Sequence, residues 1–183
     1  TNVSTTQCLD PKTGDWAFDL LERLGIPTRL FPKIIDAGDS YGLLSEEICA
    51  ELGAPRVPVI AVATHDTGSA VVAVPSQEKD FIFISCGTWS LFGTELPAPV
   101  INEVSMRFNL TNEGGYGRTT RFLKNIMGLW LIQESRRQWI REGAQVSYGD
   151  LEQEALACAP FKCFIDPDDD SFVAPGDLPR RVQ

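Results

Sequence analysis

The chain has 183 residues, 43% of them hydrophobic, so it can bury a sizeable core and is globular rather than disordered. Its formal charge of -9 offers no attraction to nucleic acid or to an anionic membrane surface, so neither is an expected partner. The five cysteines form no C-x-x-C pair, and no apolar run approaches the roughly 18 residues that span a bilayer. We therefore expect a soluble, cytoplasmic protein with reduced thiols.

The first part of the chain contains two helix patterns. The stretch "GDWAFDLLERLGIP" predicts a short helix with Asp15 as its N-cap and Gly25 as its stop. The stretch "LLSEEICAELG" predicts a second helix that begins after Ser45 and ends at Gly53.

A buried strand and a small-residue helix are expected next. "RVPVIAVA" is continuously apolar and rich in β-branched residues, which indicates a strand covered on both faces. "TGSAVVAVP" fits a tightly packed helix that ends at Pro75. His65, the single histidine of the chain, and Asp66 lie at the junction, where α/β folds usually place ligand chemistry.

The alternative to a ligand site at this junction is a purely structural role for both residues. Asp66 directly before a helix is a preferred N-cap, and its side chain could accept from the amides of Gly68 or Ser69. Spacing alone favours that interpretation. His65 is similarly more often a core or turn histidine than a catalytic one.

The polar stretch "SQEKD" predicts a domain junction near residues 76–80, after which "FIFISCGTWSLFGTE" predicts two strands joined by a turn at Cys86-Gly87-Thr88. Amides around a glycine turn can form an anion-binding concavity, and the Thr88 hydroxyl adds a donor. An ordinary hairpin turn is the alternative.

After a further turn, "TNEGGYG", the longest predicted helix runs over roughly 122–141, with an apolar stripe that includes Leu123 and Met127. On such a helix Asn125 would lie opposite the stripe, with Gln133 on its flank. The two amides could contact a nucleotide, although plain surface exposure is commoner.

Several familiar sites are excluded. One histidine cannot build a His-Asp metal phosphohydrolase or a zinc protease, and no phosphate loop or dinucleotide-binding glycine motif is present. In "IDPDDDSF" the required glycine and closing glutamate of a calcium loop are missing, so a solvated acidic turn is expected. No metal site made by the chain itself is predicted. The mixture of strands, hairpin and helices favours a layered α/β architecture.

The stretches "ATHDTGSAVVAVP", "SCGTWSLFG", "NLTNEGGYG", "RFLKNIMGLWLIQES" and "DPDDDSFVAPGDLP" together resemble the FGGY carbohydrate kinases, in particular the branch that acts on L-rhamnulose. The resemblance extends from "TTQCLDPKTGDW" almost to the C-terminus. It implies a two-lobed fold of the actin and hexokinase type, with ribonuclease-H-like α/β cores and with sugar and ATP meeting in the cleft. Residues 1–78 would belong to the N-terminal lobe and 79–183 to the C-terminal lobe.

The resemblance also implies roles for individual residues. Asp66 would be the catalytic base that accepts the proton of the sugar hydroxyl, and His65 would contact the sugar. Thr88, with Gly87 in the same turn, would bind the ATP phosphates, and Asn125 and Gln133 would also contact the nucleotide. The implied reaction is ATP- and Mg²⁺-dependent phosphorylation of L-rhamnulose to L-rhamnulose 1-phosphate.

The family's N-terminal Asp/Gly phosphate motif and C-terminal glycine-rich adenosine motif have no counterpart in this sequence. The chain is therefore expected to be the middle of a longer enzyme and inactive by itself. The alternatives are a non-catalytic binding or regulatory protein with this fold, a kinase of another sugar such as L-fuculose, and a phosphohydrolase with Asp66 as nucleophile.

Overall fold

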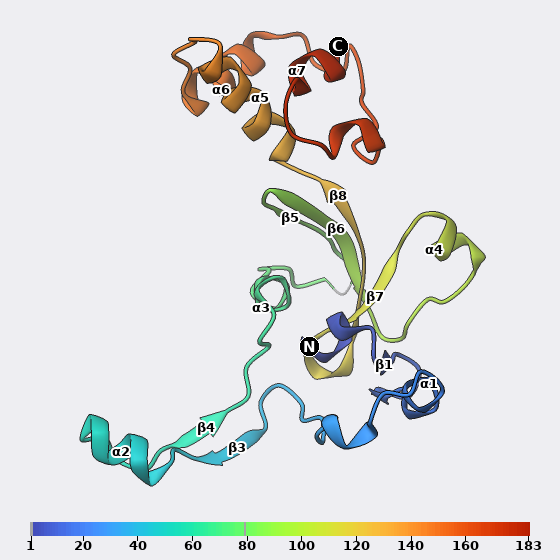
Figure 1. Cartoon of the computed structure of the whole chain (residues 1–183), viewed down its shortest axis with the longest axis vertical. Helices are drawn as coiled ribbons and strands as arrows, with labels where there is room; N and C mark the ends of the chain where they lie inside the picture. The colour runs from blue at the N-terminus through green and yellow to red at the C-terminus, as the bar shows by residue number, and fades with distance from the viewer. Residues whose placement is uncertain (1, 79) are drawn as a thin grey trace. The chain divides into compact units, whose positions relative to one another are not determined.

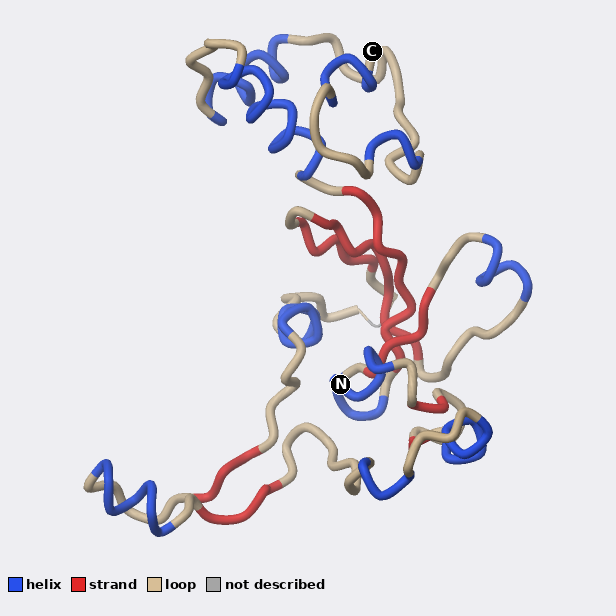
Figure 2. Tube along the Cα trace, viewed as in Figure 1, coloured by secondary structure: helices blue, strands red, loops and turns tan. Residues whose placement is uncertain are grey.

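Short helices and strands alternate along the chain (Figures 1 and 2) in the computed structural model, which describes residues 2–78 and 80–183. The helices are α1 Phe18–Arg23, α2 Glu46–Leu52, α3 Asp66–Val72, α4 Glu103–Arg107, α5 Trp130–Arg141, α6 Tyr148–Ala157 and α7 Leu178–Val182. The strands are β1 Leu9–Asp10, β2 Asp15–Trp16, β3 Ser40–Leu43, β4 Pro58–Ile60, β5 Ile82–Cys86, β6 Trp89–Leu96, β7 Thr111–Gly114 and β8 Thr120–Met127. This mixed α/β content confirms the predicted class.

A four-stranded sheet with the order β5-β6-β8-β7 carries most of the regular pairing, beside the two-stranded sheets β1-β2 and β3-β4. Strands β7 and β8 are antiparallel, with Thr111 opposite Leu123. A Cβ added at Gly93 of β6 would lie 2.5 Å from the Cβ of Leu123, so only glycine allows β6 to approach β8 this closely. Leu123 is fully buried as a result.

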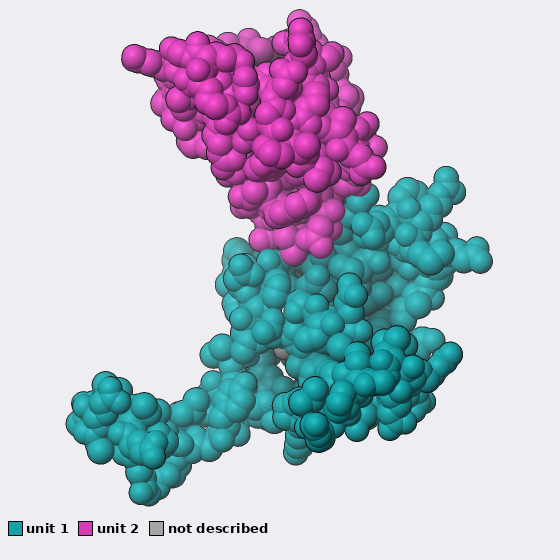
Figure 3. Space-filling model, viewed as in Figure 1, with its two compact units in different colours: residues 1–83, 92–124 teal, residues 84–91, 125–183 magenta. Residues whose placement is uncertain are grey.

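The chain divides into two compact units, coloured separately in Figure 3: residues 1–83 with 92–124, and residues 84–91 with 125–183. In the first unit the buried apolar side chains are Leu21, Ala61, Val71, Phe83 and Leu123. In the second they are Met127, Phe172 and Leu178. The predicted domain boundary between 78 and 79 falls at a position outside the described residues.

For the two N-terminal helices, the predicted start is correct for α2 and wrong for α1. Helix α2 is as predicted, because the Ser45 side chain accepts from the Ile48 amide at 3.4 Å and Gly53 ends the helix in the left-handed conformation. The predicted N-cap of α1 is wrong. Helix α1 follows Ala17 without a side-chain cap, and Asp15 instead pairs with Asp10 as part of the β1-β2 ladder.

The strand predicted in "RVPVIAVA" forms, but its predicted burial is wrong. Only residues Pro58–Ile60 are extended, as β4, and they pair antiparallel with β3. Every residue of β3 and β4 is exposed, so within the described residues neither face of this pair is covered. The continuous apolar pattern therefore predicted the strand correctly, but not its burial, since no layer in the described part of the chain covers either face.

The helix predicted over 122–141 is wrong in its first part, which is strand β8, followed by α5 from Trp130. The apolar residues Leu123, Met127 and Trp130 fit a helical stripe. Leu123 and Met127 are also four residues apart, which places them on the same face of a strand. Pairing with β6 and β7 selects the strand. Similarly, the start of "TNEGGYG" is strand β7, and the turn is confined to its end.

Among the described residues no helix combines the length and apolar character needed to cross a membrane. The acidic segment expected to be a solvated turn is one, since Asp166, Asp168 and Asp170 are all exposed.

Candidate functional site

The junction between β4 and α3 is organised by His65 rather than by Asp66. Thr64 takes the left-handed conformation, with φ 48°, and turns the chain into the helix. His65 is the N-cap, and its Nδ1 accepts the Gly68 amide at 3.3 Å. Because Nδ1 accepts, the proton of the neutral ring is on Nε2, which can donate to a ligand. The alternative in which Asp66 caps α3 through Gly68 or Ser69 is therefore wrong.

Asp66 is the first residue of α3, and its side chain is 97% exposed. One carboxylate oxygen, Oδ1, accepts the Thr67 amide at 2.7 Å and lies 3.5 Å from His65 Nδ1. The local hydrogen bond orients the carboxylate without burying it. An exposed, oriented carboxylate beside an imidazole can accept a proton from a bound hydroxyl group, which is the chemistry of a general base.

In the second unit, the turn between β5 and β6 is bonded to the start of α5. The Leu129 amide donates to the Gly87 carbonyl at 2.9 Å, and the Trp130 amide donates to the Thr88 carbonyl at 3.1 Å. A Cβ at Gly128 would lie 2.4 Å from Ser90 Oγ and 2.7 Å from the Gly87 carbonyl oxygen. This close approach fixes the turn against the first turn of the helix.

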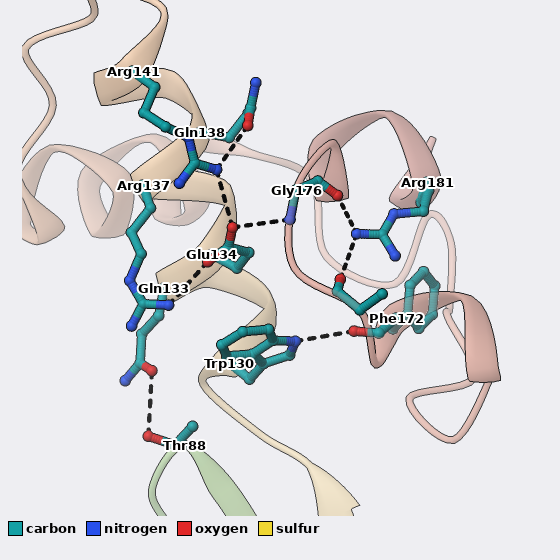
Figure 4. Close-up of polar contacts among 11 residues, drawn as sticks. Thr88, Trp130, Gln133, Glu134, Arg137, Gln138, Arg141, Phe172, Gly176 and Arg181 are labelled. Carbon is teal, nitrogen blue, oxygen red and sulfur yellow. Dashed lines mark hydrogen bonds and ion pairs between the residues drawn. The ribbon is translucent and has the colours of Figure 1, made fainter.

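The same contact brings Thr88 and Gln133 together across 45 positions of sequence. The Thr88 hydroxyl donates to Gln133 Oε1 at 3.3 Å (Figure 4). The Gly87 amide donates to the Trp89 carbonyl at 2.8 Å. This N–H group, which was expected to help bind an anion, is therefore already hydrogen-bonded within the turn. The exposed Thr88 hydroxyl and the Gln133 amide therefore form the polar surface here.

Asn125 is not on the same helix as Gln133, as the sequence had suggested. It is an exposed residue of strand β8, in the same compact unit as Thr88 and Gln133. The predicted site residues thus fall into two groups: His65 with Asp66 in the first unit, and Gly87, Thr88, Asn125 and Gln133 in the second.

A charged cluster that was not predicted from the sequence lies next to Gln133 on α5. The Glu134 side chain is only 3% exposed and pairs with Arg137 at 2.9 Å and Arg141 at 3.0 Å. Hydrogen bonds from Arg137, from Arg141 and from the Gly176 amide lower the pKa of Glu134 to about 2. A glutamate followed by arginines three and seven residues later on a helix was an available sequence signal.

Neither a cavity nor a ready-made metal cluster coincides with these residues. A cavity of about 680 Å³ in the first unit is lined by residues from 3–37, 97–99 and 112–120, and Asp66 is not among them. Within residues 2–78 and 80–183, no group of three or more His, Cys, Asp or Glu side chains is placed to hold a metal. The candidate sites are accessible surfaces built at two strand-to-helix junctions.

Two family models match the chain. The N-terminal domain of the FGGY family of carbohydrate kinases matches residues 1–73, and the C-terminal domain of the same family matches residues 82–183. The chain belongs to the FGGY family of carbohydrate kinases.

Curated relatives match the chain from end to end. Rhamnulokinases from Bacteroides thetaiotaomicron, Bacillus subtilis and Oceanobacillus iheyensis are 42%, 40% and 43% identical to it over 183 residues. The match covers 100% of this chain but only 37%, 37% and 38% of those proteins. The chain thus spans little more than a third of the length of these relatives.

Solved sugar kinases share the fold. A xylulose kinase from Lactobacillus acidophilus superposes with a TM-score of 0.67 at 18% identity, over 83% of this chain and 30% of that one. A gluconate kinase from the same organism gives a TM-score of 0.62 at 17% identity, with the same coverage. At this level of identity the likeness concerns the fold alone.

Proposed function

We propose that this chain is part of an ATP-dependent sugar kinase that converts L-rhamnulose to L-rhamnulose 1-phosphate. The observation that carries the proposal is Asp66, an oriented and almost fully exposed carboxylate at the start of α3, in a chain of the FGGY family. The choice of sugar is supported by the rhamnulokinases that are 40–43% identical to it.

In the proposed reaction Asp66 accepts the proton of the sugar's primary hydroxyl. The sugar oxygen then forms a bond to the γ-phosphorus of ATP, and the bond from that phosphorus to the bridging oxygen of ADP breaks. A sugar hydroxyl is a poor nucleophile, and phosphoryl transfer depends mainly on positioning and charge stabilisation. One well-placed base, together with Mg²⁺ and fixed hydrogen-bond donors, is therefore sufficient, and no covalent enzyme intermediate is required.

His65 would hold the sugar through its Nε2–H group, because its other ring nitrogen already accepts the Gly68 amide. Fixing one nitrogen also fixes the plane of the ring, so the donor direction is set before the sugar binds. At this junction His65 would then orient the sugar hydroxyl, and Asp66 would deprotonate it.

The nucleotide would bind to the second group of residues. The Thr88 hydroxyl would turn from Gln133 to a phosphate oxygen, and Gln133 would then offer its own amide to the nucleotide. Asn125 is proposed to contact the nucleotide as well. Gly87 keeps the turn small: a Cβ there would lie 3.2 Å from the Trp89 carbonyl oxygen.

Mg²⁺ is proposed to enter with ATP. Mg²⁺ usually keeps several waters and binds through substrate phosphates with one or two carboxylates, so it needs no cluster of protein ligands. No residue of the chain is assigned as a ligand of the ion, because Asp66 is proposed as the base. When bound, the ion would neutralise charge on the phosphates.

We further propose that residues 1–78 belong to the N-terminal FGGY lobe and residues 79–183 to the C-terminal lobe, supported by the two family matches. The proposed location is the cytoplasm, where ATP is available and the free cysteines stay reduced. The 183-residue polypeptide alone is expected not to turn over, because two of the family's nucleotide motifs have no counterpart in it.

The test is an ADP-release assay of the protein encoded by the complete open reading frame, with L-rhamnulose and L-fuculose as acceptors and the 183-residue polypeptide in parallel. We expect ATP-dependent turnover that is faster with L-rhamnulose, and none from the short polypeptide. A preference for L-fuculose would overturn the substrate. Release of phosphate from sugar phosphates without ATP would overturn the reaction.

A further inference from the structure

Arg137 follows Gln133 by one turn of α5, and its side chain reaches back toward the start of the helix. Side chains on an α-helix tilt toward its N-terminus. Arg137 Cζ lies 5.5 Å from the centroid of the Trp130 ring, and Trp130 is the first residue of α5. The Trp130 amide bonds to the Thr88 carbonyl, so the guanidinium lies toward the end of α5 that holds the turn.

Two neighbours fix the orientation of this guanidinium. Arg137 Nη1 donates to Glu134 Oε2 at 2.9 Å, and the Trp130 ring lies on one side of the group (Figure 4). Glu134 is itself held by Arg141 and by the Gly176 amide. A planar guanidinium that is already oriented loses little conformational freedom when it binds an anion.

The charge of the cluster favours an anionic ligand. Glu134 contributes one negative charge, and Arg137 and Arg141 contribute one positive charge each, so the cluster has a net charge of +1. The Arg137 side chain remains 52% exposed, so part of it faces solvent. The residues proposed to bind the nucleotide, namely Gly87, Thr88, Asn125 and Gln133, are uncharged, whereas a nucleotide polyphosphate carries several negative charges.

We infer that Arg137 is a further nucleotide-binding residue, which donates to a phosphate oxygen of the nucleotide held by Thr88 and Gln133. Glu134 is its positioning residue, because it holds the guanidinium beside Gln133. The inference rests on the proposed function only in taking the ligand to be ATP. It adds to that function the positive charge that the uncharged side chains do not provide.

The test compares R137Q with R136Q in the protein encoded by the complete reading frame. Arg136 is the matched control on the same helix, because its Nε donates to the Val146 carbonyl and its Cζ lies 4.6 Å from the Tyr148 ring centroid. The measurements are the KM values for ATP and for the sugar, and the Kd of ATP by calorimetry, each over a range of NaCl concentrations.

For R137Q we expect the KM and Kd of ATP to rise about tenfold and to depend less on salt, since a charge-assisted hydrogen bond is lost. The KM of the sugar should not change, whereas a merely structural defect would not single out ATP. E134Q should raise the KM of ATP by a smaller factor, and R137K should lie between wild type and R137Q. R136Q should match wild type.

An ATP Kd for R137Q within twofold of wild type, or an equal rise in R136Q, overturns the inference. If R137Q does not fold, R137K decides, and an ATP Kd for that variant equal to that of wild type overturns the inference. A failure of the proposed function would look different: the wild-type protein would bind ATP without phosphorylating any ketose. A wild-type protein that does not bind ATP at all contradicts both.

Discussion

The two strand-to-helix junctions that carry the candidate residues are built in opposite ways. At the start of α3 the proposed base is an almost fully exposed carboxylate, held by one short hydrogen bond to the next amide. At the start of α5 the backbone amides bond to the turn, and a buried glutamate fixes two arginines. The proposed base is exposed and can be replaced without harm to the fold, whereas the proposed nucleotide site is part of the packing of its unit. Substitutions at the two junctions should therefore separate activity from stability.

The largest expected effect is on activity at the first junction. Asp66→Asn in the protein encoded by the complete reading frame should lower kcat by about 100- to 10,000-fold, the usual contribution of a general base. Its Tm should stay near that of wild type, because Asn can still accept the Thr67 amide. Asp19→Asn is the control, since Asp19 is also an exposed acid in the first turn of a short helix. Wild-type turnover by Asp66→Asn would show that this carboxylate is not the base.

Gly128 tests the packing of the second junction. Gly128→Ala places a methyl group within 3 Å of Ser90 Oγ and of the Gly87 carbonyl, so we expect a loss of about 1–3 kcal/mol in unfolding free energy, measured by urea denaturation. Gly149→Ala is the matched control, because its nearest neighbour is Ser147 Oγ at 3.7 Å. That variant should be as stable as wild type or slightly more stable. Equal effects in both variants would contradict the close approach of turn and helix.

Removing the Thr88 hydroxyl should affect nucleotide binding more than stability. Thr88→Val keeps the shape of the side chain, and we expect the KM of ATP to rise about tenfold because a hydrogen bond to a charged phosphate is lost. Thr94→Val removes a different hydroxyl, which donates to the Phe81 carbonyl at 2.7 Å. That control should lower the Tm and leave the KM of ATP unchanged. The opposite pattern would assign Thr88 a structural role.

The smallest expected signal is a pH trend in stability. The folded protein holds the pKa of Glu134 at about 2, below its usual 4.5, so the charged form stabilises the fold at pH values above 4.5. This contribution is lost as the pH falls from 4.5 toward 2. The Tm difference between wild type and Glu134→Gln should therefore narrow from about pH 6 to about pH 3. A constant difference would mean that the pairing with Arg137 and Arg141 does not stabilise the fold.

The sequence predicted best what depends on neighbouring residues. Ser45 and Gly53 mark the ends of α2, and the Gly87-Thr88 turn joins two strands, because capping and turn preferences act over a few residues. Its predictions failed where pairing between segments far apart in the chain determines the secondary structure. Strand β8 exists because β6 and β7 pair with it, and its apolar spacing also fits a helix.

The sequence pointed to the individual residues of the candidate site, but it did not predict how they are arranged in space. Asp66 opens a helix that comes after a strand, but β4 already ends at Ile60, and the role of N-cap belongs to His65. The contact of Thr88 with Gln133 depends on the fold of the second unit and has no local signal. Glu134 was overlooked because a glutamate on a helix is usually exposed, and only the structure shows its carboxylate buried between two arginines.

The most direct test of the account measures nucleotide binding by the variant that should lack the base. Calorimetric titration of Asp66→Asn with a non-hydrolysable ATP analogue, alongside its kcat for L-rhamnulose, separates the two junctions in one protein. The account predicts a wild-type Kd for the analogue together with a loss of turnover. Retained turnover, or a loss of nucleotide affinity in step with turnover, would contradict the division of base and nucleotide site between these two junctions.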